Sequence, residues 1–151
     1  MTILSVGELI KRAKKFEIRI EKYYAAIRDE TEDSGVKLLT YYLCRHRRHI
    51  RHALEDFDSR EVAKICAELL MYAVEFKPEK KFHVLNIKPH DIKGHELIEC
   101  AITYNEDLIK LYKNIIKQPI SKEAKLFFES LVCIEEKDIV MLKKMLAMHY
   151  F

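Results

Sequence analysis

The sequence predicts an all-α protein, a bundle of four long helices arranged as two antiparallel hairpins. Three observations support this fold class. The 151 residues include only three glycines and three prolines, too few turn residues for a sandwich or barrel of short strands. Apolar residues recur at alternating spacings of three and four along four separate segments, which is the period of an amphipathic helix. The first half of the chain also resembles the second half.

This internal repeat aligns residues 8–57 with residues 96–145, without a gap, when the first segment is moved forward by 88 positions. Eleven of the fifty aligned pairs are identical. Chance would give about three, assuming roughly 6% identity per position from average composition. We therefore expect one domain over residues 1–151, in which two helical hairpins are joined by a crossover over about residues 58–91.

The first hairpin opens with a capping box. Ser5 is followed three residues later by Glu8, a pattern typical of a helix N-terminus. The first helix is expected to run to about Asp29, and the second to cover about residues 35–57. Because only the short polar turn ETEDSG separates them, the two helices should be antiparallel.

The middle of the chain is predicted to hold a short helix and an extended connector. Residues 60–74 carry a one-sided apolar stripe, which indicates a fifth, minor helix. The following segment, residues 75–90, contains Pro78 and Pro89. Since proline disfavours the interior of a helix, we expect this segment to cross the body of the protein in extended form.

The second hairpin is delimited by similar signals. Asp91 is the expected N-cap of the third helix, which should end before Pro119. The fourth helix is expected to start near Ser121 and to run almost to the C-terminus. The turn between them is short, so these helices should also be antiparallel.

Charge and hydropathy exclude several classes of function. The net charge is only +3, because 27 basic residues are offset by 24 acidic ones, and this excess is too small to predict binding to nucleic acid. No apolar run approaches the roughly 18 residues of a membrane span, and the N-terminus lacks the apolar segment of a signal peptide. We therefore expect a cytoplasmic protein whose partner is neither a nucleic acid nor a membrane.

Cysteines and short motifs agree with this expectation. The four cysteines contain no CxxC pair and are interpreted as reduced thiols; they are Cys44, Cys66, Cys100 and Cys133. The sequence has no Gly-rich phosphate loop, no GxSxG and no HExxH. Nucleotide-dependent chemistry is therefore unsupported.

Each of the four apolar stripes is interrupted by polar residues near its middle. Glu17 interrupts the first stripe, Arg47 the second and Asn105 the third. The fourth stripe is interrupted by Glu135 and Asp138. A charged residue in a protein core is strongly unfavourable unless it is paired or binds a metal. Interruptions at one level of all four helices therefore predict a shared polar layer inside the bundle.

The two hairpins resemble those of ferritin-like proteins of the rubrerythrin type. The resemblance rests on FEIRIEKYY with VKLLTYYLCRHRRHI and on YNEDLIKLY with AKLFFESLVCIEEKD, and it covers about two thirds of the chain. It implies a four-helix bundle with a long second connection and a di-iron or di-manganese site. In that family the metals are held by one Glu from each of helices one and three and by a Glu-x-x-His pair from each of helices two and four.

The residues at the corresponding positions depart from the family pattern. Glu17 and Glu135 match it outright. The other ligand positions do not match and are occupied by Asn105, Arg47, Ile50 and Asp138. These departures fall on the residues that define the activity, so the resemblance supports the fold more strongly than it supports iron chemistry.

Arg47 is expected to take the place of the metals. Its guanidinium has five donors and no acceptor, so it can bridge Glu17 and Glu135 in roughly the space of two metal ions. The excess of carboxylate then predicts that one acid is protonated, solvated, or paired with His46 or His49. The alternative is a residual oxygen-rich site for one divalent cation, formed by Glu17, Glu135, Asp138 and Asn105.

The second helix also carries a run of arginines and histidines, RHRRHIRH. Four residues of this run are expected to share an exposed face: Arg45, Arg48, His49 and His52. A metal site there has too few ligands, and the neighbouring arginines disfavour a cation. An anionic partner or a pH-sensitive contact is a further hypothesis. The favoured interpretation is a solvated basic face.

Two hypotheses about function follow. The favoured one is a non-catalytic ferritin-like protein, a structural or interaction module that has lost its di-metal site and needs no cofactor. The alternative is a ferritin-like or rubrerythrin-like oxidoreductase or metal-storage protein, which keeps a residual carboxylate site and binds iron or manganese. An unidentified protein partner, and either a monomer or a homodimer, are compatible with both.

Overall fold

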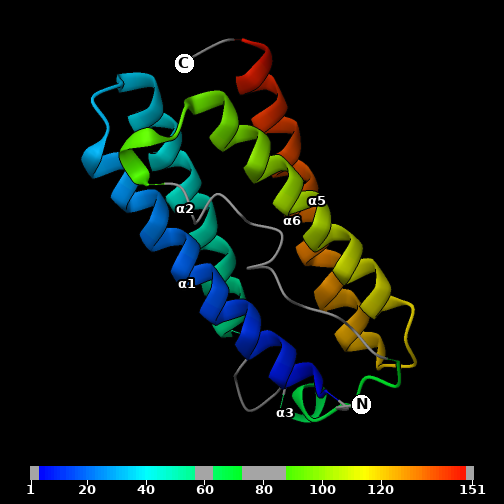
Figure 1. The fold of residues 1–151 in the computed structure, drawn as a ribbon. Helices are drawn as coiled ribbons and strands as arrows, with labels where there is room; N and C mark the ends of the chain where they lie inside the picture. The colour runs from blue at the N-terminus through cyan, green and yellow to red at the C-terminus, as the bar shows by residue number, and fades with distance from the viewer. Residues whose placement is uncertain (1–3, 57–62, 73–87, 149–151) are drawn as a thin grey trace.

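The computed structural model describes residues 4–56, 63–72 and 88–148 of the chain. Figure 1 shows its helices in chain order: α1 (Val6–Glu30), α2 (Ser34–Asp56), α3 (Ala63–Cys66), the 3-10 helix η3 (Pro89–Asp91), α5 (Gly94–Ile116) and α6 (Lys122–Ala147). The described residues form no strand, only one isolated β-bridge. The prediction of an all-α fold with four long helices is therefore confirmed.

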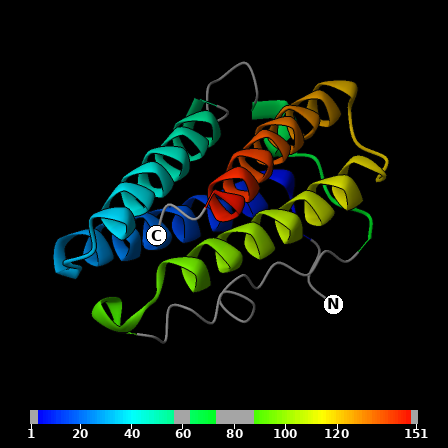
Figure 2. The same cartoon turned by 90° about the horizontal axis from the view of Figure 1, so that it is seen from above.

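The four long helices form two antiparallel hairpins. α1 packs against α2, and α5 packs against α6. Viewed from above, the two hairpins lie beside each other as a four-helix bundle (Figure 2). A continuous apolar core fills the space between them, to which each long helix contributes buried residues such as Ile10, Leu43, Leu108 and Leu131. None of the described helices combines the length and the apolarity that a membrane span requires.

The first hairpin forms for the local reasons that its sequence indicates. Ser5 Oγ accepts a hydrogen bond from the Glu8 backbone N–H at 3.1 Å, and Glu8 Oε2 accepts one from the Ser5 backbone N–H at 3.2 Å. This reciprocal pair is the predicted capping box. At the turn into α2, Asp33 Oδ1 accepts hydrogen bonds from the backbone N–H groups of Gly35 and Val36. These bonds satisfy the first donors of α2, so the turn can be short.

The short helix α3 is smaller than predicted. The expected helix over residues 60–74 is reduced, within the described residues, to Ala63–Cys66. The reason is a competing set of backbone hydrogen bonds: the Val6 N–H donates to the Glu68 carbonyl at 2.8 Å, and the Leu70 N–H donates to the Leu4 carbonyl at 2.9 Å. Backbone groups that pair with the start of α1 cannot continue a helix.

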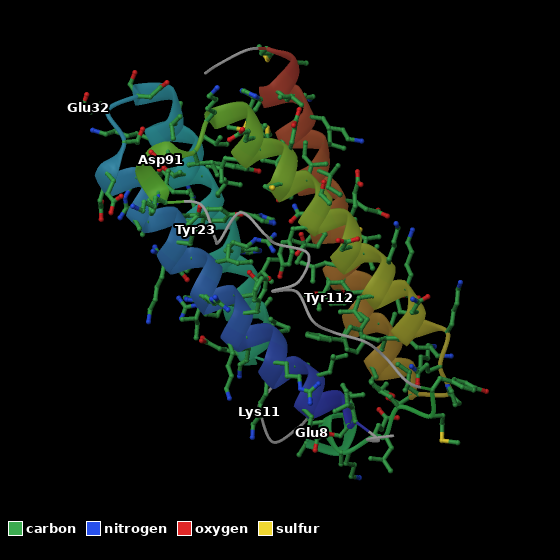
Figure 3. The ribbon with its side chains drawn as sticks, in the orientation of Figure 1. Glu8, Lys11, Tyr23, Glu32, Asp91 and Tyr112 are labelled. Atoms are coloured by element: carbon green, nitrogen blue, oxygen red, sulfur yellow. The ribbon has the colours of Figure 1, made fainter. Side chains whose placement is uncertain are left out.

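Most of the predicted connector lies outside the described residues. This applies to the expected break at Asp58 and to Pro78, so the crossover is described only over residues 63–72 and from residue 88 onward. There Pro89 begins the 3-10 helix η3, which packs against α1. In Figure 3, Asp91 of η3 and Glu32 of the first turn lie at one end of the bundle, and Glu8 lies at the other.

The predicted start of the third helix was wrong. Asp91 is not the N-cap of α5 but the last residue of η3, and α5 begins at Gly94 after Lys93. Pro89 is preorganised to start its own helical turn, and the Asp91 N–H closes that turn on the Lys88 carbonyl at 2.9 Å. The buried, extended Ile92 then separates the two helices.

The second hairpin is tied to the first at the end of the bundle where α1 begins. α6 begins near Ser121, as predicted; Ser121 is its N-cap, and its Oγ accepts from the Ala124 backbone N–H at 3.1 Å. The Glu68 carboxylate accepts from the Ser121 backbone N–H at 2.7 Å and from its hydroxyl at 2.8 Å. Because the backbone of Glu68 already pairs with Val6, this one residue joins α1 to the α5–α6 turn.

We expect Glu68→Ala to lower the free energy of unfolding by about 1 to 3 kcal/mol, because it removes a charged acceptor from two donors of a helix N-terminus. Glu129→Ala, at an exposed position of α6, is the matched control and should change stability by less than about 0.5 kcal/mol. Chemical denaturation measures both changes. Equal stability of the two variants would contradict the role assigned to Glu68.

Candidate functional site

The structure brings together the five polar residues that interrupt the apolar stripes. Glu17 comes from α1, Arg47 from α2, Asn105 from α5, and Glu135 and Asp138 from α6. None of them exposes more than 3% of its surface. Each sits at a position of its helix that faces the bundle interior, so the four helices contribute to one buried polar layer.

Arg47 is the central residue of this layer. Its Nη1 donates to Glu17 Oε1 at 3.0 Å, and its Nη2 donates to Glu135 Oε2 at 2.9 Å. The guanidinium carbon lies 5.5 Å from the centre of the Tyr104 ring, a cation–π contact. Burial opposes the charge of Arg47, but the neighbouring Glu135 and Glu17 outweigh it and raise the pKa of the guanidinium well above its ordinary value. Arg47 is therefore a permanent buried cation.

Asp138 organises the other side of the layer. Its Oδ2 accepts a hydrogen bond from Asn105 Nδ2, and its Oδ1 accepts one from the Tyr42 hydroxyl at 2.9 Å. His46 Nε2 lies 3.1 Å from Asp138 Oδ2 and 3.8 Å from Glu135 Oε2. Arg47 Nη2 is 3.8 Å from the same Asp138 oxygen. The fourth helix is thus connected to the second and the third through one carboxylate.

Three residues of the layer were missed or left open by the sequence. His46 and His49 were both candidates to pair with the excess carboxylate; the structure places His46 at Asp138 and leaves His49 exposed. Tyr42 lies one helical turn before His46 and stacks on its ring at 6.5 Å between centroids. That four-residue spacing could have indicated it. Tyr104, whose hydroxyl donates to Glu17 Oε1 at 3.4 Å, has no comparable signal in the sequence.

The two glutamates that share Arg47 differ in their pKa. Burial raises the pKa of Glu17 to about 7, although Arg47 opposes this shift. Burial also acts on Glu135, but there Arg47 and His46 together outweigh it and lower the pKa below its ordinary value. The difference follows from His46, which lies beside Glu135. Glu17 is therefore the acid that takes up a proton near neutral pH, which relieves the excess of carboxylate.

Three buried polar atoms near this layer have no hydrogen-bond partner among the described residues: Glu17 Oε2, Glu135 Oε1 and the Tyr112 hydroxyl. Unpaired buried polar atoms are rare in folded proteins and ordinarily bind a proton, an ordered water or an ion. Glu17 Oε2 is the natural position for the proton that the raised pKa predicts, because Glu17 Oε1 already accepts from Arg47.

A group of three potential metal ligands is also present in the described part of the chain. His46, Glu135 and Asp138 each offer one donor atom, and these atoms lie within 4.8 Å of one another. This set differs from the four residues that the sequence suggested for a residual cation site. Glu17 is not part of the group and contacts Arg47 instead.

The arginines and histidines of the surface run lie as the sequence indicated. Arg45, Arg48, His49 and His52 are all exposed. Arg48 Nε donates to Glu21 Oε1 of α1 at 2.9 Å, so one member of the run is held by an ion pair. None of the four belongs to a group of three potential metal ligands among the residues described.

The four cysteines form no disulfide. Cys44 is buried, and its thiol donates to the Glu21 carbonyl at 3.4 Å. Burial raises the pKa of Cys44 and that of Cys100. Because the thiolate is the reactive form of cysteine, neither thiol has the lowered pKa of a nucleophile.

No family model matches the sequence, and no curated protein matches it. A crystal structure of a Thermotoga maritima protein, provisionally described as a ferritin-like diiron-carboxylate protein, is similar to this chain. The TM-score is 0.71, the sequence identity is 16%, and the match covers 97% of each chain. At this identity the likeness concerns the fold and transfers no residue roles. The predicted resemblance is therefore confirmed for the fold: the chain is a ferritin-like helical bundle.

Proposed function

We propose that this chain is a non-catalytic ferritin-like module, with a structural or interaction role, in which an ion-pair layer takes the place of a di-metal site. The observation that carries the proposal is the position of Arg47, whose guanidinium reaches Glu17 at 3.0 Å and Glu135 at 2.9 Å. These are the two residues that match the family's glutamate ligands. An arginine between them occupies the space that a metal would need.

The residues present do not fit two metal ions. Ile50 is completely buried and offers no ligand atom, and Asn105 offers only a neutral one. Two divalent cations together with Arg47 would carry five positive charges, against three from the carboxylates of Glu17, Glu135 and Asp138. Such an excess of buried charge is strongly unfavourable. Arg47 alone balances Glu135, and the raised pKa of Glu17 removes part of the remaining negative charge.

The proposal predicts the metal content of the purified protein. Iron and manganese should be present at well below one equivalent, and a chelator should leave the melting temperature unchanged, because no folding energy comes from a bound metal. Elemental analysis by plasma mass spectrometry, combined with thermal unfolding with and without EDTA, measures both. One or two equivalents of metal, or unfolding by EDTA, would show that the layer binds metal.

Arg47→Ala should destabilise the protein by about 3 to 5 kcal/mol, since it leaves two carboxylates buried without their cation. Arg47→Met, which keeps most of the side-chain volume, should also be clearly destabilising, and this separates charge from packing. Arg45→Ala, at an exposed position of the same helix, is the control. If Arg47→Met were as stable as the wild type in urea denaturation, the proposed ion-pair layer would be contradicted.

A variant that restores the family's ligand residues tests whether these positions are equivalent to the family's metal-ligand positions. It carries the four changes Arg47→Glu, Ile50→His, Asn105→Glu and Asp138→His. We expect it to bind iron or manganese, because it would then supply four glutamates and two histidines from the four helices. The same variant with Glu135→Ala added is the control and should bind less. If the restored variant bound no more metal than the wild type, these positions would not be the equivalents of the family's ligands.

The pKa of Glu17 predicts how stability depends on pH. An ordinary glutamate in the unfolded chain titrates near pH 4.3, as about 4.3 is its unperturbed pKa. Burial raises the pKa of Glu17 to about 7 in the folded protein. Between these values the folded state binds more protons than the unfolded state, so the free energy of unfolding should fall as pH rises from about 5 to 8.

Glu17→Gln removes this contribution but keeps an oxygen that can accept from Arg47. Relative to the variant, the wild type should lose about 2 kcal/mol over this pH range. Both proteins contain the same histidines, so the effect of histidine titration on stability is removed when the two unfolding free energies are subtracted. Parallel stability profiles of the wild type and Glu17→Gln would show that Glu17 is ionised throughout.

A second candidate function is binding of a single divalent cation, and one observation favours it: the proximity of His46, Glu135 and Asp138. One imidazole and two carboxylates form a ligand set that transition metals accept. Arg47 opposes it, because Nη2 lies 3.8 Å from Asp138 Oδ2. If this candidate is correct, the wild type should bind about one equivalent of manganese or iron, and His46→Ala should lose it while Glu17→Gln keeps it.

A further inference from the structure

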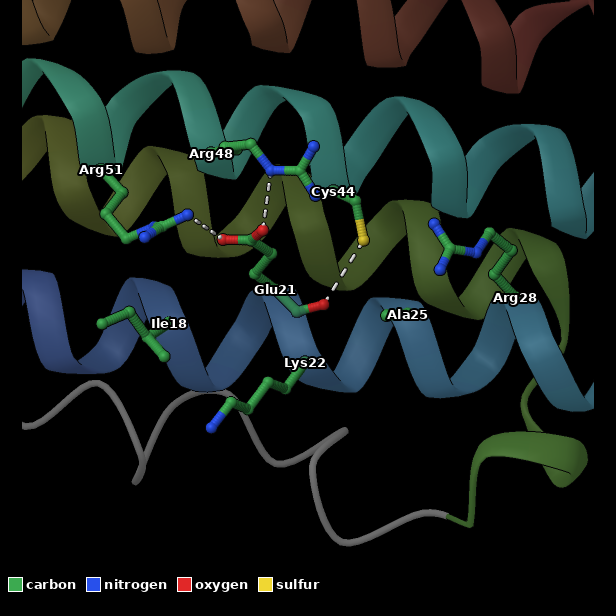
Figure 4. Close-up of a pocket in the computed structure, with 8 residues that line it drawn as sticks. All are labelled: Ile18, Glu21, Lys22, Ala25, Arg28, Cys44, Arg48 and Arg51. Atoms are coloured by element: carbon green, nitrogen blue, oxygen red, sulfur yellow. Dashed lines mark hydrogen bonds and ion pairs between the residues drawn. The ribbon is translucent and has the colours of Figure 1, made fainter.

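A groove of about 280 Å³ lies on the outer side of the α1–α2 hairpin. Figure 4 shows the side chains that line it, among them four basic residues, Lys22, Arg28, Arg48 and Arg51, one acid, Glu21, and the thiol of Cys44. None of these residues belongs to the buried polar layer. Of the exposed arginine–histidine face of α2, only Arg48 takes part.

The groove follows from the periodicity of the two helices. Glu21, Ala25 and Arg28 are separated by four and three residues, and Cys44, Arg48 and Arg51 are separated in the same way. Each set therefore forms a line along one face of its helix. The antiparallel packing of α1 and α2 brings the two lines together as the walls of the groove.

Positive charge exceeds negative charge in this groove. Glu21, the one acid among the described residues that line the groove, accepts from Arg48 Nε at 2.9 Å and contacts Arg51 Nη2 at 3.2 Å. Two acids at the rim add only weak contacts: Asp29 with Arg28 at 3.4 Å and Glu55 with Arg51 at 3.5 Å, both solvent-exposed. Lys22 forms no ion pair with any residue that the structure describes. Among the described residues, four cations thus line the groove with one acid inside it and two more acids at its rim, which leaves an excess of positive charge that favours an anion.

The donors of the groove are only partly used. Arg51 Nε is buried and has no hydrogen-bond partner within the described chain, which is unfavourable for a guanidinium nitrogen. Arg48 bonds Glu21 through Nε. In Figure 4 the terminal nitrogens of Arg48 and of Arg28 point toward each other from opposite sides of the Cys44 thiol. The space next to the Cys44 thiol is therefore flanked by the guanidinium N–H donors of Arg28 and Arg48.

We propose that this groove binds a small phosphate-bearing molecule, with the phosphate between the guanidinium groups of Arg28 and Arg48. A phosphate has more oxygens than a carboxylate, so it can offer a separate pair of oxygens to each of the two guanidinium groups. The volume lies at the lower end for ligand pockets, so the ligand is a small phosphate rather than a large cofactor. The free anion and the headgroup of an anionic lipid share this chemistry.

Cys44 contributes to binding and not to a covalent step. Its thiol is engaged with the Glu21 carbonyl, and its pKa is raised by burial, so the group stays neutral beside the anion. A neutral thiol neither repels the phosphate nor attacks it. The proposal does not depend on the role of the buried layer, because the two sites share no residue.

Isothermal titration of the full chain with inorganic phosphate, pyrophosphate and glycerol phosphate, together with amide chemical-shift mapping, tests the proposal. Saturable binding is expected, with the largest shifts at Arg28, Cys44 and Arg48. Arg28→Gln and Arg48→Gln should each weaken binding by about tenfold or more, since each removes a charged donor pair. Arg45→Gln, exposed on α2 outside the groove, is the matched control and should change affinity by no more than about twofold.

Glu21→Gln is expected to strengthen phosphate binding, a result that partial unfolding of the variant could not produce. It removes the one acid among the described lining residues and frees Arg48 from its ion pair, so phosphate should bind about tenfold more tightly. Vesicles of phosphatidylcholine with and without phosphatidic acid separate the two sources: binding that requires phosphatidic acid and Arg28 indicates a lipid headgroup, and binding of the soluble phosphates alone indicates a free ligand.

Several outcomes would overturn the proposal. They are the absence of saturable binding to all of these probes, an equal loss in Arg45→Gln and Arg28→Gln, and weaker binding by Glu21→Gln. The first would mean that the groove is a solvated surface, and either of the others would mean that phosphate does not lie between Arg28 and Arg48.

Discussion

A guanidinium group buried between two carboxylates constrains the whole bundle. Arg47 reaches Glu17 on one neighbouring helix and Glu135 on another, and all three side chains are removed from water. A buried charge is tolerated only when its partners stand within hydrogen-bond distance. The hairpins therefore cannot slide along each other without separating these atoms. The apolar stripes above and below drive the helices together, and the ion pairs specify the level at which they meet.

The layer combines contacts within each hairpin with contacts between the hairpins. Within them, Arg47 pairs with Glu17 and Asn105 pairs with Asp138. Between them, Arg47 reaches Glu135, and Asp138 accepts from Tyr42. Arg47 and Glu135 are 88 residues apart, the offset of the predicted internal repeat. At this aligned position the first hairpin carries the cation Arg47 and the second carries the anion Glu135. The two hairpins, although similar in sequence, are therefore complementary in charge at this level.

The parts of the fold that could be predicted are those encoded by local periodicity and capping. The long helices, the cap at Ser5 and the start of the last helix near Ser121 depend on residues a few positions apart, and the structure has them as expected. The extent of the short helix was wrong because distant groups decide it, whereas the cap assigned to Asp91 was wrong because Pro89, two residues earlier, starts a separate helical turn. The Glu68 carbonyl bonds Val6, and its carboxylate bonds Ser121, 53 residues away. No pattern within a window of local sequence contains these partners.

The sequence by itself determined which residues lie at the middle of the four apolar stripes, because helical periodicity assigns each residue to a face before the helices pack. Glu17, Arg47, Asn105, Glu135 and Asp138 could be named on this basis. The tertiary structure decided which of them touch. It turned His46 rather than His49 toward Asp138, placed Tyr104 beside Glu17, and formed the basic groove from one line of residues on each of two helices. These contacts depend on the rotation and axial position of one helix against another, which side-chain packing and long-range ion pairs set.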